Sequence, residues 1–189
     1  TTQIALSWTA STGATSYSVL RATSANGSYT TIATGLSGTS YTDTGLSSGT
    51  TYYYAVTATN GSGSSANSSQ VSAITTPASP GGVTATAGNG QVSLSWASST
   101  GATGYSVLRA TSSNGSYTTI ATGVAGTSYT DTGLANGTTY YYVVVATNGS
   151  GSSANSSQVN ALTAPAPPTS LTSTPDNAQV SLLWHSSTG

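Results

Sequence analysis

The chain contains no cysteine, methionine, phenylalanine, lysine or glutamate. Without cysteine it forms no disulfides, so each folded unit must be held by its core alone. No hydrophobic run approaches the ~18 residues that a membrane-spanning helix needs. Charge is almost absent as well: two arginines and three aspartates give a net charge of −1 in 189 residues. Such a chain offers no electrostatic footprint for nucleic acid or for an anionic membrane.

The abundant residue types indicate a folded protein with a polar, well-solvated surface. Twelve tyrosines and three tryptophans, with regularly placed aliphatic residues, argue against disorder. Serine and threonine must keep the surface solvated, because charge cannot. With so few acids and one histidine, we expect stability to respond little to pH.

The sequence repeats itself every 88 residues. Trp8 recurs as Trp96 and Trp184, and residues 13–71 match residues 101–159 at 51 of 59 positions. This period exceeds that of solenoids and propeller blades and fits a chain of whole small domains.

The repeat predicts three segments. Residues 1–76 form a copy that lacks its first strand, residues 77–164 form a complete copy, and residues 165–189 are the opening strands of a third. The last segment is too short to bury a core alone. Two interpretations remain open: the chain is a slice of a longer array, or its terminal segments complete a neighbouring chain.

Short segments with alternating apolar and polar residues predict strands rather than helices. In the second copy Val92, Leu94 and Trp96 alternate with serines, and Asn89-Gly90 is a hairpin-turn dipeptide. A Gly/Ser-rich loop is expected over residues 148–155. Seven short strands separated by turn signals at this spacing predict an all-β, two-sheet sandwich.

Several motifs of the second copy resemble those of a fibronectin type III domain, an immunoglobulin-like sandwich with seven strands. The order and spacing of Val83-Thr84-Ala85, Val92 to Trp96, Tyr105-Ser106-Val107, Tyr129-Thr130-Asp131 and Leu134 to Tyr140 carry the resemblance. The variety is similar to that of secreted or cell-surface bacterial proteins. It implies a tandem array in an extracellular or cell-surface location.

The resemblance also implies roles for individual residues. Leu134 and Tyr140, with Leu46 and Tyr52 in the first copy, match a tyrosine corner, whose hydroxyl bonds backbone just upstream. The predicted structural core therefore consists of Trp8, Trp96, Trp184, Tyr52, Tyr140, Leu46 and Leu134. Asp43 and Asp131 match an aspartate that caps a turn. The Arg-Gly-Asp tripeptide of integrin-binding members is absent from the loop that begins at Asn148, so that recognition is not expected.

No constellation for catalysis, cofactor binding or metal binding is present in the sequence, so we expect no enzyme activity. The serines lack a histidine to activate them, because His185 lies in the incomplete copy and its counterparts are Thr9 and Ala97. One aspartate per complete copy is too few for calcium.

Asparagine occurs repeatedly in the glycosylation pattern Asn-x-Ser/Thr. The candidates are Asn26, Asn60, Asn67, Asn114, Asn136, Asn148 and Asn155. The alternative is that these asparagines serve as turn residues.

One apolar stripe is expected on an outer sheet face of the second copy. If Tyr140, Tyr142 and Val144 face the core, then Tyr141, Val143 and Val145 face outward, with Leu108 beside them. Exposed apolar patches often mark contacts, so this stripe is a candidate interaction face; the alternative is a β-propensity choice on a solvated face.

The function predicted from the sequence is that of a non-catalytic extracellular stalk or filament, with itself as the expected partner through strand exchange or the apolar stripe. The alternatives are spacer or accessory modules of a secreted polysaccharide-degrading enzyme, or an adhesin for a polysaccharide or a cell surface.

Overall fold

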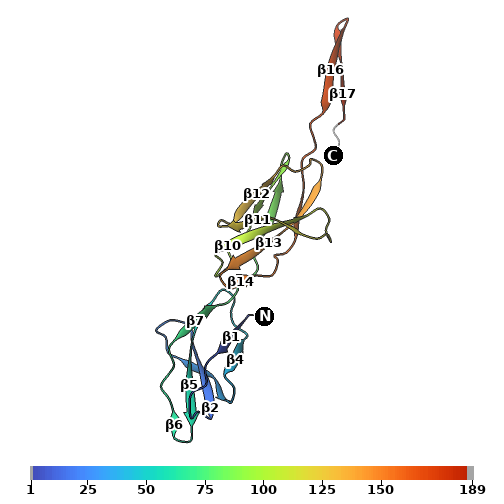
Figure 1. Ribbon diagram of the computed structural model, residues 1–189. Coiled ribbons are helices and arrows are strands. Elements are labelled where there is room, and N and C mark those ends of the chain that lie inside the picture. Colours follow the sequence, from blue (N-terminus) through green and yellow to red (C-terminus); the bar gives the residue numbers. More distant parts are fainter. Residues whose placement is uncertain (1, 187–189) are drawn as a thin grey trace. The chain divides into compact units, whose positions relative to one another are not determined.

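The structure, a computed structural model, describes residues 2–186. Within this range all helical or strand structure is β-strand, which confirms the all-β prediction, and no helix could span a membrane. The chain divides into two compact units, one consisting mainly of residues 1–78 and the other mainly of residues 79–189 (Figure 1).

The first unit is a sandwich of a two-stranded and a five-stranded sheet. The small sheet pairs β1 (Gln3–Ser7) with β4 (Ser40–Thr44) in antiparallel register. The larger sheet has the order β3-β2-β5-β6, with β7 also paired to β5. Its strands are β2 (Ser16–Ala22), β3 (Thr30–Leu36), β5 (Thr51–Asn60), β6 (Gly63–Ser64) and β7 (Val71–Ile74).

The core of this unit lies between the two sheets. It is built from Ile4, Val19, Leu46, Tyr52 and Tyr54, all less than 10% exposed. Each buried Val, Leu or Ile side chain contributes about 1.5–3 kcal/mol relative to its exposed state.

The second unit has a three-stranded sheet in the order β12-β9-β8 and a five-stranded sheet in the order β11-β10-β13-β14, with β15 also paired to β13. The strands of the first sheet are β8 (Thr84–Ala87), β9 (Gln91–Ser95) and β12 (Ser128–Thr132). Those of the second are β10 (Gly104–Ala110), β11 (Thr118–Val124), β13 (Thr139–Asn148), β14 (Gly151–Ser152) and β15 (Val159–Leu162).

Strand β9 shows why the sequence alternates. Val92 and Leu94 are 0% and 2% exposed, whereas Gln91, Ser93 and Ser95 are exposed. Successive side chains of a strand point to opposite faces, so one face is buried and the other is solvated. The predicted Asn89-Gly90 turn joins β8 to β9, with Gly90 at φ 62°, the left-handed region that such a turn requires.

One strand was not expected from the sequence. Thr147 and Asn148 at the end of β13 pair with Ser152 and Gly151 of β14, inside the segment predicted to be a loop. Its Gly/Ser composition suggested irregular structure, but Gly151 at φ 130° allows the sharp return that this pairing needs.

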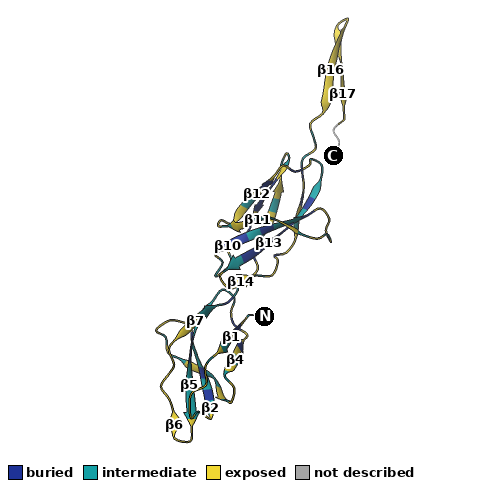
Figure 2. Cartoon of the chain, in the orientation of Figure 1, coloured by how far each residue is buried: buried dark blue, intermediate teal, exposed yellow. Residues whose placement is uncertain are grey.

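The remaining strands, β16 (Thr169–Asp176) and β17 (Gln179–His185), form a hairpin whose residues are exposed throughout (Figure 2). Trp184 is 54% exposed, so its predicted place in a core is wrong. A two-stranded hairpin has no second sheet to pack against within the described residues, and burial of this tryptophan needs one.

Candidate functional site

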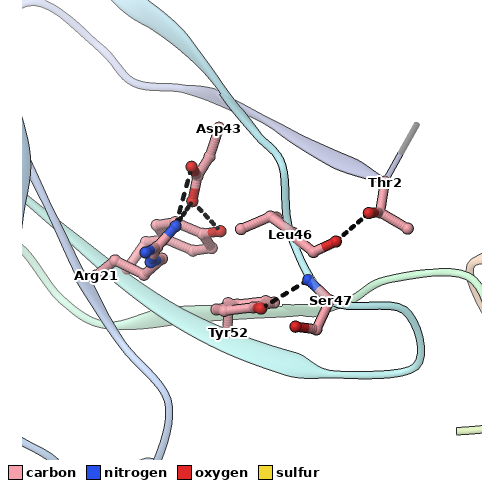
Figure 3. A network of polar contacts seen from close by, with 7 residues as sticks. Thr2, Arg21, Asp43, Leu46, Ser47 and Tyr52 are labelled. Atoms are coloured by element: carbon pink, nitrogen blue, oxygen red, sulfur yellow. Dashed lines mark hydrogen bonds and ion pairs between the residues drawn. The ribbon is translucent and has the colours of Figure 1, made fainter. Parts of the chain in front are cut away.

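The most elaborate polar cluster of the first unit joins its two sheets. Arg21 of β2 donates from Nη1 to both carboxylate oxygens of Asp43 of β4, at 3.1 and 3.0 Å (Figure 3). The hydroxyl of Tyr54 donates to the same carboxylate at 2.8 Å. Asp43 is 4% exposed, so this carboxylate is buried with three hydrogen bonds to balance its lost hydration.

This cluster governs the ionisation of Tyr54. Burial, and then the hydrogen bond and negative charge of Asp43, raise the pKa of Tyr54 well above its ordinary value of 10.0. The phenol therefore remains a donor to the carboxylate across the physiological range.

The tyrosine corner lies next to the cluster. The hydroxyl of Tyr52 accepts a hydrogen bond from the backbone N–H of Ser47 at 3.0 Å, and the guanidinium of Arg21 sits 5.4 Å from the centre of the Tyr52 ring (Figure 3). Tyr52 and Leu46 are each 6% exposed. The arginine is thus held by a carboxylate and by an aromatic face.

The second unit repeats the cluster. Arg109 donates to both oxygens of Asp131 at 3.2 and 3.0 Å, and Tyr142 donates to Asp131 at 2.9 Å. Burial, followed by the hydrogen bond to Asp131, raises the pKa of Tyr142 in the same way. The Tyr140 hydroxyl accepts from the N–H of Ala135 at 3.1 Å, as the tyrosine corner predicts.

These contacts correct the expected role of the two aspartates. Asp43 and Asp131 do not cap turns: each lies within a strand, faces the core and bonds an arginine from the opposite sheet. The sequence signal was available, since each arginine lies on the core face of its strand, two positions after a buried valine, but the partner lies 22 positions away.

Two of the three predicted core tryptophans pack inside their units. Trp96 is 5% exposed and contacts Tyr105 edge-on, with ring centres 5.4 Å apart and planes at 60°. Trp8 is half-buried and packs against Tyr17 at 5.6 Å and 62°. Leu134 and Tyr140 are each 8% exposed.

The candidate interaction face differs from its prediction. Val143 and Val145 are 3% and 9% exposed, whereas Tyr141 and Leu108 are partly exposed. β15 pairs with β13 only at residues 139–142, so Val143 and Val145 lie beyond that pairing and are nevertheless buried. The continuous exposed apolar stripe that the alternation predicted is therefore absent, and Tyr141 and Leu108 are the members that remain partly accessible.

The candidate glycosylation residues differ in exposure and in hydrogen bonding. Five are exposed: Asn26, Asn60, Asn67, Asn114 and Asn155. Three use their side-chain nitrogen as a donor: Asn60 to the Gly13 carbonyl at 3.2 Å, Asn136 to the Asn89 side chain at 2.8 Å and Asn148 to the Gly101 carbonyl at 3.1 Å. A sugar on that nitrogen would crowd these contacts.

Within residues 2–186 no three acidic, histidine or cysteine side chains gather where they could hold a metal ion. His185 lies at the end of β17 and is exposed. The polar clusters of both units tie the two sheets together.

The two-sheet architecture, the tyrosine corners and the ionic clusters thus define a β-sandwich module held by its core. The chain belongs to the fibronectin type III family, whose model matches residues 1–74 and 78–161. Domains of this family are non-catalytic modules, and so is this chain.

The chain spans only a small part of the length of the curated relatives it matches. It is 48% identical over 67 residues to an amylopullulanase of Thermoanaerobacterium saccharolyticum, covering 35% of this chain and 5% of the relative. It is 35% identical over 179 residues to chitinase A1 of Niallia circulans, covering 85% and 24%. A solved Fn3-like protein from Clostridium thermocellum is 42% identical, with a TM-score of 0.42 over 48% of this chain and 96% of that one.

Proposed function

We propose that these residues are accessory modules of an extracellular polysaccharide-degrading enzyme, in which they act as spacers. The observation that carries the proposal is the similarity to two enzymes named for action on polysaccharides, of which the chain matches only 5% and 24% of the length. Catalysis then resides elsewhere in the polypeptide.

The internal construction of the modules supports a spacer role. Both units carry the same Arg-Asp-Tyr cluster with nearly the same distances, and most side-chain polar contacts of one recur in the other. A spacer needs length and stability, which identical copies supply. Polymers too large to enter a cell must be degraded outside it, which favours an extracellular location.

The stalk or filament predicted from the sequence remains a second candidate with less support. No relative named above is described as a fibre, and the apolar stripe that was expected to mediate assembly is largely buried. An adhesin has no observation in its favour beyond the exposed tyrosines described below.

The proposal is tested on the native polypeptide. An antibody raised against residues 1–189 should capture from culture medium a larger protein that hydrolyses a neutral polysaccharide. Deleting residues 1–164 should lower hydrolysis of insoluble polymer while leaving hydrolysis of short soluble oligosaccharides intact. Capture of a polypeptide without hydrolytic activity, assembled into filaments visible by electron microscopy, would refute the proposal.

A further inference from the structure

Each unit carries two partly exposed tyrosines on the outer face of its five-stranded sheet. In the first unit Tyr53 of β5 pairs directly with Ala22 of β2. Tyr29 immediately precedes Thr30 of β3, which pairs with Arg21, so Tyr29 lies on the other side of Ala22. Neighbouring strands lie about 4.8 Å apart, so side chains from the two strands beside β2 are close enough to cover Ala22 between them.

The alanine between the tyrosines shows that their rings cover the sheet. Ala22 lies on the face opposite the core, next to inward-pointing Arg21, and yet is only 4% exposed. A small side chain on an outer face is buried only if larger neighbours lean over it. Tyr29 and Tyr53 are the large residues that flank it in this row, and both keep part of their surface in solvent.

A carboxamide fixes one of the rings. Gln70 donates from Nε2 to the Tyr29 hydroxyl at 2.7 Å and to the Ala25 carbonyl at 2.9 Å. Its side-chain oxygen, without a partner among the described residues, remains an acceptor. We call the surface formed by Tyr29, Tyr53 and the side-chain oxygen of Gln70 the platform of the first unit. It combines an aromatic ring fixed by a hydrogen bond, a second ring and an amide oxygen at the edge.

The second unit preserves the arrangement. Ala110, Tyr117 and Tyr141 are the repeat counterparts of Ala22, Tyr29 and Tyr53, each 88 residues later. Ala110 is again 4% exposed, and Gln158 donates to the Tyr117 hydroxyl and to the Ser113 carbonyl. Tyr141 pairs across the strand with Asn160, where the first unit has Ser72 beside Tyr53. The second platform therefore has an additional carboxamide.

The chemistry of this surface selects an uncharged, hydroxyl-rich partner. Four of the five charged residues of the chain form the buried Arg-Asp pairs, and the fifth, Asp176, lies in β16, so neither platform carries a charge. Aromatic faces stack against apolar C–H surfaces, and hydroxyls and carboxamides both donate and accept hydrogen bonds. A pyranose ring presents both kinds of surface, with C–H groups on its faces and hydroxyls around its rim.

We propose that the tyrosine pairs, Tyr29 with Tyr53 and Tyr117 with Tyr141, are platforms that bind a neutral polysaccharide chain. This inference rests on the proposed accessory role and gives the modules a second task, contact with the polymer. Each unit carries one such platform, so a chain of these units offers the polymer more than one weak contact.

The test is affinity electrophoresis of residues 1–189 in gels that contain hydroxyethyl cellulose, pullulan or glycol chitin, with polygalacturonate as a charged control. We expect retardation by at least one neutral polymer and none by polygalacturonate. Replacing Tyr53 and Tyr141 together by serine should weaken that retardation roughly tenfold, since each stacked ring contributes about 0.5–1.5 kcal/mol. The Tyr→Phe pair at the same positions should retain most of it.

The controls separate binding from folding and from self-contact. Thr42→Ala with Thr130→Ala, on the exposed face of the opposite sheet, should leave retardation unchanged, and circular dichroism melting should show every variant folded. Three results would overturn the platforms: no retardation by any neutral polymer, retardation that survives the serine pair, or loss of self-association, measured by light scattering, as the main effect of that pair. None of these touches the accessory role, which depends on the catalytic activity of the captured native polypeptide.

Discussion

The buried ion pair makes Asp131→Asn an informative single substitution. Asp131 is 4% exposed and accepts two hydrogen bonds from Arg109 and one from Tyr142. An amide keeps one acceptor oxygen but loses the negative charge, so the guanidinium remains beside a neutral group. The predicted result is a marked loss of stability in the second unit.

The magnitude follows from the exposure of the two partners. Removing one member of a fully buried pair costs about 3–5 kcal/mol. The Arg109 side chain is 32% exposed, so water replaces part of the lost interaction, and we expect about 2–3 kcal/mol. For a unit of this size that corresponds to a decrease in Tm of roughly 10–20 °C.

The assay is urea unfolding followed by tryptophan fluorescence, with scanning calorimetry for Tm. The double variant Arg109→Met, Asp131→Asn removes both charges and should cost less than the sum of the two single substitutions, because neither partner is then left buried and unpaired. Asp43→Asn supplies a matched variant in the first unit, where the geometry is the same.

Two results would refute this reasoning. A change below about 0.5 kcal/mol for Asp131→Asn would place the pair among ordinary surface contacts. Additive costs in the double variant would show that Arg109 and Asp131 act independently.

Three further predictions follow from single contacts. Tyr140→Phe should cost about 1 kcal/mol in urea unfolding, because the N–H that its hydroxyl satisfies loses its partner; an unchanged midpoint would contradict this. From pH 8 to about 10 stability should be constant, and above that it should fall by about 1.4 kcal/mol per pH unit for each of Tyr54 and Tyr142, because their pKa values are raised and only the unfolded chain ionises there; urea midpoints between pH 8 and 11.5 would show it, and the double Phe variant should flatten the curve. If the native protein is N-glycosylated, glycopeptide mass spectrometry should find sugar at exposed positions such as Asn67 and Asn155, and occupancy confined to the hydrogen-bonded asparagines would be the contrary result.

The alkaline prediction revises the expectation of a flat pH response. That expectation considered acids and histidine and left out phenols. Tyr54 becomes responsive to pH only because the fold buries it against Asp43. The sequence around Tyr54 contains no signal that its pKa is raised in the folded protein.

Local patterns were enough to predict the strands. Val92 and Leu94 alternate with serines in β9, and Asn89-Gly90 supplies the turn before them. The tyrosine corner was implied by the resemblance to a fibronectin type III domain, and it spans only the five positions between Ala135 and Tyr140. These features depend on contacts between near neighbours in the chain, which spacing specifies directly.

Sequence patterns alone thus specified the repeat, most of the strands and the inward face of strands such as β9. Tertiary structure decided which inward faces meet and what covers the outward ones. Arg21 and Asp43 come from different sheets and meet only when the sandwich closes. Ala22, Tyr29 and Tyr53 form one row because three strands pair in a particular register, and Val143 is buried although alternation places it on the outer face. The physical reason is that alternation fixes the side to which a residue points, whereas its neighbours on that side come from strands distant in sequence.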